Sequence, residues 1–89
     1  MSVVSYSGQL YAVSMKQASA DAVYKELGKR IVAGRKARNI SQEQLAAASD
    51  VDRSHIGFIE QGRRKPTVST LYKITQALGI SLEQIFKGL

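Results

Sequence analysis

Helix-capping signals recur at short intervals from residue 41 onward, and they constrain the fold more than any other feature of the chain. Ser41 and Ser81 each stand three residues before a glutamine, which is the capping-box pattern that begins a helix. Thr67 is a further N-cap candidate, and Gly79 is the expected C-cap of the segment that Thr67 opens. A chain divided this often makes short helices, so we expect an all-α bundle with a small core.

The spacing of apolar residues predicts five helices joined by connections of two to six residues. The first is expected from about Ser19 or Asp21 to Arg38 because apolar residues recur there every three or four positions. The others are opened by Ser41, Asp52, Thr67 and Ser81.

The first eighteen residues differ from the rest. The stretch "VVSYSGQLYAVSM" is rich in β-branched and aromatic residues, and Ser7-Gly8 is a candidate turn, so its local preference is a strand or hairpin. We therefore divide the chain into an N-terminal extension, residues 1–18, and a helical domain, residues 19–89. Met15 is an alternative start for the chain.

The stretch "AAASDVDRSHIGFIEQG", residues 46–62, resembles one helix that stops and restarts. Asp50 is expected to make the turn, because Asp tolerates a left-handed backbone better than most residues do. Val51 would plug the turn, Asp52 would cap the new helix, and the small Ala46 would let the two helices cross closely. Two short helices held at a steep angle form a unit whose second helix can protrude.

Composition excludes several other classes of protein. The 89 residues suffice for one domain, and 44 % of them are apolar, as in globular proteins. The sequence contains no cysteine, so it offers neither a disulfide nor a thiolate metal site. Neither a signal peptide nor an apolar run of membrane-spanning length is visible, which favours a cytoplasmic location and no membrane partner.

Positive charge is concentrated in two stretches. Thirteen Lys and Arg against seven Asp and Glu give a net charge of +6 and a pI near 9.9. Residues 29–38 hold five of these cations and residues 61–73 hold four, and neither stretch contains an acid. Each stretch is either a solvated face or a surface that binds the phosphates of a nucleic acid.

Residues 27–86 resemble the phage repressor and Cro-type helix-turn-helix family, the XRE family. The resemblance is carried by "LGKRIVAGRKARNISQEQLA", "VDRSHIGFIEQGRRKP" and "LYKITQALGISLEQIF", whose elements occur in the family's order and spacing. It implies a five-helix, lambda-repressor-like DNA-binding domain whose third helix lies in the major groove. Two residues depart from the family pattern, since Asp50 replaces a usual glycine and Ser49 a usual buried aliphatic residue.

On the third helix, Ile56 and Ile59 are expected to face the core by their spacing, and the remaining residues to face outward. We expect Arg53 to pair with guanine, and Phe58 either to contact a thymine methyl group or to be partly buried against the first helix. His55 has no catalytic or metal-ligating partner and is expected at the sugar-phosphate backbone or in solvent. The full set of expected DNA-binding residues is Gln42, Arg53, Ser54, His55, Gly57, Phe58, Gln61, Arg63, Arg64 and Lys65.

Three further roles follow from the resemblance. Gln42, with the start of its helix, would grip one phosphate. Arg35 and Glu60 would form a partly buried salt bridge that joins the first helix to the third. The family's members usually bind inverted repeats as dimers, and two surfaces could supply the dimer contact: the last helix, with Ile85, Phe86 and Leu89, or the N-terminal extension.

We therefore expect a sequence-specific transcription regulator that binds double-stranded DNA as a homodimer, acting as a repressor or an autoregulating controller. An antitoxin that also represses its own promoter is the alternative. We expect no enzyme, because the sequence contains no catalytic pair, nucleophile motif or phosphate-binding glycine loop. We also expect neither a cofactor nor a metal ion, and no small-molecule effector is evident.

Overall fold

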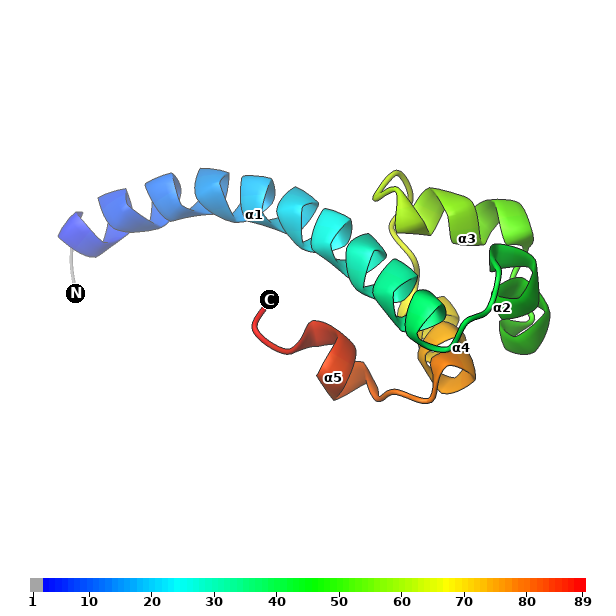
Figure 1. The fold of residues 1–89 in the computed structure, drawn as a ribbon. Coiled ribbons are helices and arrows are strands. Elements are labelled where there is room, and N and C mark those ends of the chain that lie inside the picture. The colour runs from blue at the N-terminus through cyan, green and yellow to red at the C-terminus, as the bar shows by residue number, and fades with distance from the viewer. Residues whose placement is uncertain (1–2) are drawn as a thin grey trace.

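Residues 3–89 fold as five helices, the number that the sequence predicts (Figure 1). The computed structural model describes the backbone of residues 3–89 and the side chains of residues 20–89. The helices are α1 (Val3–Ala37), α2 (Gln42–Ser49), α3 (Arg53–Glu60), α4 (Val68–Leu78) and α5 (Leu82–Phe86). No strand occurs in residues 3–89, so the all-α fold class is confirmed for that range.

The strand or hairpin expected near the N-terminus is wrong from Val3 onward, and the expected helix start at Ser19 or Asp21 is wrong as well. Residues 3–18 continue α1 as one helix of 35 residues that extends well beyond the other four helices (Figure 1). Starting a helix is costly, but adding residues to an existing one is not, so a segment of mixed preference follows the helix it adjoins. Residues 1 and 2 lie outside the described residues. Secondary structure does not change at residue 18, and the division into two domains stays a prediction.

The core lies where α3, α4 and α5 pack against the C-terminal half of α1, with α2 packed against α3 and α4. Leu27 and Ile31 of α1 are almost completely buried, with 1 % and 0 % of their surface exposed. The other buried apolar residues come from all four remaining helices: Leu45, Ala46, Ile56, Ile59, Leu71, Ile74, Leu78 and Ile85. Ala46 is among them, as its expected place at a helix crossing requires. Ile85 is a core residue, whereas Phe86 and Leu89 are exposed.

Gly28 sets the distance between α1 and α3. A Cβ atom at this position would lie 2.4 Å from the carbonyl oxygen of Glu60 and 2.6 Å from that of Ile59. Both obstacles are backbone atoms, which cannot move aside as the end of a side chain can. The close approach of α3 to α1 therefore requires glycine here.

The interrupted helix of residues 46–62 turns at Asp50, as predicted. Asp50 adopts the left-handed conformation, with φ 56° and ψ 44°, and its N–H caps α2. Val51 is half-buried and packs against the core from this turn. Asp52 occupies the N-cap position of α3, but its side chain makes no capping hydrogen bond, so its expected capping role is not observed.

The remaining caps match the sequence pattern. Both capping boxes form, because the side chains of Ser41 and Ser81 each accept a hydrogen bond from the backbone of the glutamine three residues later. The Thr67 hydroxyl caps α4 in the same way, and Gly79 ends that helix with φ 71°. Ser49 is buried, and its hydroxyl donates to the carbonyl oxygen of Leu45 at 2.7 Å, so its polar group is satisfied. Within residues 3–89, no helix has both the length and the apolar character needed to cross a bilayer.

Candidate nucleic-acid interface

One side of helix α3 is buried in the core, and another side, its open face, is polar and exposed to solvent. Ile56 and Ile59 are 0 % and 1 % exposed and anchor the helix in the core, as their spacing predicts. Arg53 and Ser54 are exposed at its N-terminal end, and Gln61 is exposed just past its C-terminal end. Between these two ends, His55, Phe58 and Glu60 are half-buried, so the open face of α3 is most exposed at its ends.

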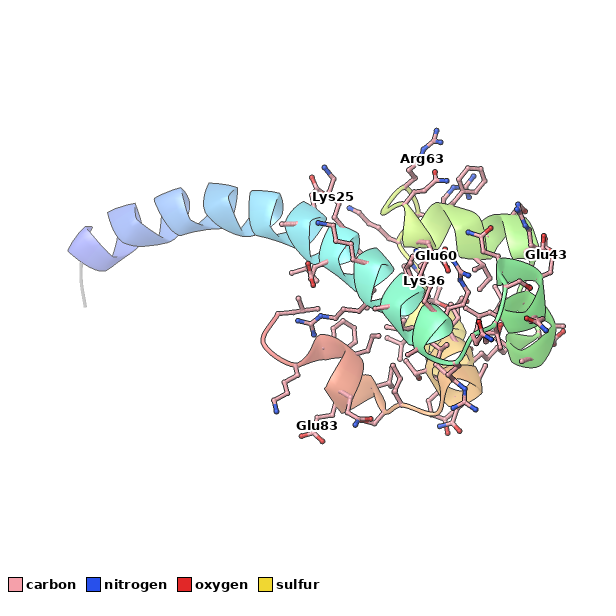
Figure 2. All side chains as sticks on the ribbon, in the orientation of Figure 1. Lys25, Lys36, Glu43, Glu60, Arg63 and Glu83 are labelled. Carbon is pink, nitrogen blue, oxygen red and sulfur yellow. The ribbon has the colours of Figure 1, made fainter. Side chains whose placement is uncertain are left out.

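The loop after α3 adds three exposed cations to this face: Arg63, Arg64 and Lys65. Arg63 extends from the outer edge of the molecule, and Lys25 of α1 extends on the same side (Figure 2). Glu83 of α5 points away from the opposite side. The second basic stretch of the sequence is thus joined to the open face of α3.

Gly57 does not lie on that face, and its expected outward position is wrong. It is buried, and a Cβ atom built on it would lie 3.9 Å from the amide nitrogen of Gln42. Helix α3 packs against α2 as well as against α1. Its open face is therefore narrower than that of a helix with only one buried side. The 3.9 Å distance is an ordinary van der Waals contact, so the packing of α2 against α3 does not itself require glycine at this position.

His55 is half-buried, and its Nε2 atom is buried without a hydrogen-bond partner among the described residues. It is therefore less exposed than a residue free in solvent would be. Within residues 20–89, no group of three His, Asp or Glu side chains is placed to hold a metal ion.

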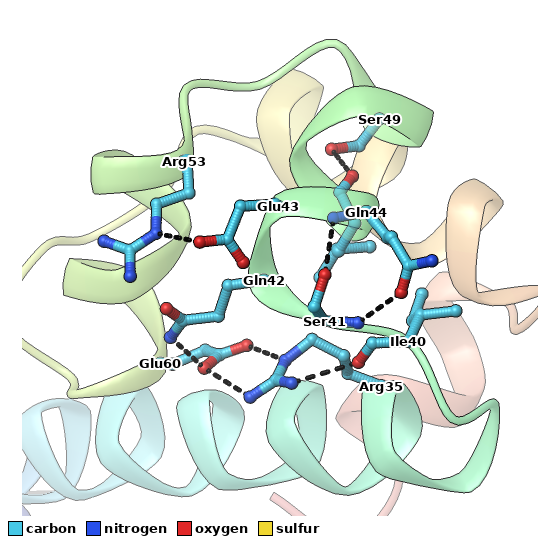
Figure 3. A network of polar contacts seen from close by, with 10 residues as sticks. Arg35, Ile40, Ser41, Gln42, Glu43, Gln44, Ser49, Arg53 and Glu60 are labelled. Carbon is cyan, nitrogen blue, oxygen red and sulfur yellow. Dashed lines mark hydrogen bonds and ion pairs between the residues drawn. The ribbon is translucent and has the colours of Figure 1, made fainter.

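The expected Arg35–Glu60 salt bridge is present and joins α1 to α3 (Figure 3). Arg35 donates from Nε to one Glu60 oxygen at 2.8 Å and from a terminal nitrogen to the other at 3.2 Å. Its remaining terminal nitrogen donates to the carbonyl oxygen of Ile40 at 3.1 Å. The two side chains are only 14 % and 4 % exposed, and the hydrogen bond to Glu60 raises the pKa of the Arg35 guanidinium.

Gln42 belongs to the same network. Its amide nitrogen donates to Glu60 at 2.8 Å, so α2 is tied to the acid that already binds Arg35 (Figure 3). One of the two N–H donors of this amide is therefore engaged inside the protein, and only the other remains for a phosphate. In this arrangement, an anion at the start of α2 would meet backbone N–H groups, which helix N-termini present.

Arg53 has a partner that sequence reasoning missed. Its Nε lies 3.4 Å from a carboxylate oxygen of Glu43 on α2, and the two side chains are 56 % and 69 % exposed (Figure 3). The N–H of its own backbone and the nearby Arg53 lower the pKa of Glu43 below its usual value. The two residues are ten positions apart on different helices, so no i,i+4 pattern could reveal the pair.

Phe58 is half-buried and lies beneath two guanidinium groups. The Cζ atoms of Arg63 and Arg64 are 5.4 Å and 5.3 Å from the centre of its ring, which is within the range of cation–π attraction. The ring is thus covered from the following loop. Phe58 was expected to be partly buried against the first helix if it did not contact DNA; it is partly buried, and the two guanidinium groups over its ring come from the following loop.

Lys65 is placed differently from the two arginines. Its Nζ lies 5.5 Å from the ring centre of Tyr24 and 3.7 Å from a carboxylate oxygen of Asp21, both on α1. The lysine and its acid are 64 % and 72 % exposed, so the pair is weak.

Comparison with known proteins agrees with this geometry. A helix-turn-helix family model, HTH_3, matches residues 31–85, which is more than half of the chain. The chain belongs to this family. The resemblance inferred from sequence is thereby confirmed, and helices α2 and α3 are its helix-turn-helix unit.

Several relatives are regulators by name. An HTH-type transcriptional regulator of Sinorhizobium fredii is 39 % identical over 57 residues, which are 64 % of this chain and 74 % of that protein. The control protein C.MunI of Mycoplasma sp is 39 % identical over 51 residues, covering 57 % and 69 % of the two chains. The immunity repressor of Bacillus phage phi105 is 42 % identical over 59 residues, but these span only 41 % of the repressor.

Solved structures show the same fold. The restriction-modification controller protein C.AhdI from Aeromonas hydrophila has a TM-score of 0.71 and 35 % identity, covering 73 % of this chain and 98 % of that one. A variant of the controller C.Esp1396I, bound to its highest-affinity operator site, has a TM-score of 0.67 and 29 % identity, covering 73 % and 86 %. The chain is therefore a DNA-binding helix-turn-helix protein of the transcription-regulator type.

Arg35→Ala should lower the free energy of unfolding by roughly 3–5 kcal/mol, because Glu60 would be left as a buried charge with one partner removed. DNA binding should be lost with stability, since Arg35 supports α3 and does not lie on its open face. Chemical denaturation and a DNA-binding assay on the same preparation measure both effects. Lys36→Ala, one position along on the exposed side of α1, is the matched control. A variant at Arg35 with full stability and no binding would contradict this role.

Proposed function

We propose that the protein is a sequence-specific regulator of transcription that binds double-stranded DNA, acting as a repressor or an autoregulating controller. The observation that carries this proposal is the open face of α3, which presents exposed Arg53 and Ser54 on a helix fully anchored by core residues. A rigid helix of this kind can enter the major groove, where base pairs are distinguishable. Its site of action would be the cytoplasm, where the DNA is.

The residues on this face would divide the work between base reading and phosphate binding. Arg53 would pair with a guanine, because its Nε is engaged by Glu43 and the terminal nitrogens remain to donate side by side. Ser54 and Gln61 would bond base edges or flanking phosphates. Arg63, Arg64 and Lys65 would lie along the sugar-phosphate backbone and supply sequence-independent affinity. Gly57 is buried and would make no contact with DNA.

The relatives named above are controllers and a repressor, which favours a regulator over an antitoxin. An autoregulating controller would bind an inverted repeat near its own promoter. This requires two copies of α3 presented about 34 Å apart, one helical turn of DNA, and hence a homodimer.

Two surfaces are candidates for the homodimer contact. The first is an apolar groove of about 300 Å³ between α1, α4 and α5, lined in part by Val23, Val68 and Phe86. Val68 is 74 % exposed, Phe86 is 42 % exposed, and Leu89 nearby in sequence is 41 % exposed, so apolar surface is concentrated around α5. The second candidate is the N-terminal extension, residues 1–18. We favour the α5 surface because its exposed apolar side chains belong to the matched domain or adjoin it.

Arg53→Ala and Arg63→Ala should impair DNA binding in different ways. Loss of Arg53 should reduce discrimination at one G·C pair by about 1–3 kcal/mol, because only a base contact carries sequence information. Loss of Arg63 should weaken binding to all duplexes and reduce the slope of log affinity against log salt by about one. Operators selected from a random duplex pool, followed by titrations at several salt concentrations, measure both quantities.

The proposal fails if the pool yields no enriched sequence, since the protein would then be a nonspecific binder of DNA. It also fails in its assignment of roles if the variant at Arg53 discriminates among base pairs as well as the unaltered protein does.

Phe86→Asp should convert a dimer to a monomer in light-scattering measurements without DNA, because it places a charge on the exposed apolar surface at α5. Glu83→Asp, on the outer side of α5, should leave the dimer intact. If Phe86→Asp stays dimeric while removal of residues 1–18 gives a monomer, the N-terminal extension is the interface instead.

A further inference from the structure

The loop between α3 and α4 is held tightly enough to place its side chains. The N–H of Gly62 donates to the carbonyl oxygen of Ile59 at 3.0 Å, and that of Arg63 donates to Phe58 at 2.9 Å. Gly62 has φ +73°, and a Cβ atom there would lie 3.1 Å from the Cα of Lys25 on α1. The loop therefore leaves α3 in one direction, pressed against α1, and its next residues start from a defined position.

Arg63 and Arg64 then bring two positive charges to a single ring. Their guanidinium centres lie 5.4 Å and 5.3 Å from the centre of the Phe58 ring, while both side chains remain exposed. Adjacent cations repel each other and would ordinarily spread apart in water. The electron-rich face of an aromatic ring attracts both, which offsets the repulsion and reduces the freedom of two long side chains.

Such a pair fits a phosphate better than it fits a base. The charges lie past the C-terminal end of α3, beyond the segment with Arg53 that would enter the groove. Guanidinium groups bind phosphate oxygens through a fixed fork of N–H donors. A ring already in contact with two arginines has part of its surface occupied, which weakens its assignment as a reader of a thymine methyl group.

We propose that Phe58 is a positioning residue, which holds Arg63 and Arg64 together as a preformed clamp for phosphates of the DNA backbone. The inference rests on the proposed function in one respect, that duplex DNA is the ligand. It differs from the sequence-based expectation, because Phe58 acts here through the two arginines and reads no base. The ring raises affinity for every duplex alike, because two arginine side chains that are already ordered lose less conformational entropy on binding.

Phe58→Leu and Phe58→Tyr test the proposal by separating apolar bulk from the aromatic face. Leucine keeps an apolar side chain without a π face, so binding to the selected operator and to an unrelated duplex should weaken by the same factor, roughly 5- to 30-fold. Tyrosine retains the ring and should restore most of the affinity. The salt slope of Phe58→Leu should match that of the unaltered protein, because both charges are still present.

The decisive comparison is made in a background that lacks both arginines. Arg63→Ala with Arg64→Ala should reduce the salt slope by about two, and adding Phe58→Leu should then weaken binding no further. Thermal unfolding of each variant shows whether a loss of affinity reflects a loss of folded protein.

Two results would overturn the proposal. If Phe58→Leu lowers discrimination at one base pair, the ring reads a base. If its effect is as large without the arginines as with them, the ring acts independently of them. Neither result touches the proposed function, which fails only if the unaltered protein binds operator and unrelated duplex equally.

Discussion

The contact between α1 and α3 is the constraint on which the position of α3 and its open face depends. Gly28 lets the backbone of α3 approach α1 until a side chain of any size would collide with the carbonyl oxygens of Ile59 and Glu60. At the same place, Arg35 holds Glu60 through two hydrogen bonds, and Gln42 adds a third from α2. One buried carboxylate thus connects three helices. Burying a carboxylate is costly, and these three hydrogen bonds offset that cost. They also fix the position of α3 relative to α1 and α2.

The cations on and beside the open face of α3 differ in whether an acidic side chain lies next to them. Arg53 is paired with Glu43, and Lys65 is close to Asp21, whereas Arg63 and Arg64 lie against the neutral ring of Phe58. The net charge of +6 therefore does not show which of these cations are paired with an acid and which are not. The two unneutralised arginines are suited to a polyanion, while an arginine oriented by an acid is suited to a contact that depends on direction.

Local signals predicted the helices from Ser41 onward because caps are properties of a few adjacent residues. The turn at Asp50 was predictable for the same reason, since a left-handed residue is set by local sterics. The N-terminal segment was not, because its preference for a strand is weaker than the advantage of extending α1. Gly57 and the Glu43–Arg53 pair depend on how α2 packs against α3, and one helix's periodicity contains no information about a neighbouring helix.

The family pattern supplied what local signals could not, namely the link between Arg35 and Glu60, which are 25 residues apart. It did not predict that Arg63 and Arg64 would contact the Phe58 ring, because the family pattern does not pair these residues. The exposure of Arg53 and Ser54 at the start of α3 was predictable from the sequence. The roles of single side chains on that helix required the three-dimensional arrangement.

The most direct test of the central claim is to locate α3 on DNA. The chain has no cysteine, so Ser54→Cys provides a single attachment point for an iron chelate that cleaves nearby DNA. The claim that the exposed start of α3 enters the major groove predicts cleavage confined to each half-site of the selected operator, and none from the same chelate at Glu83→Cys. Uniform cleavage along the duplex from Ser54→Cys, or localised cleavage only from Glu83→Cys, would contradict it.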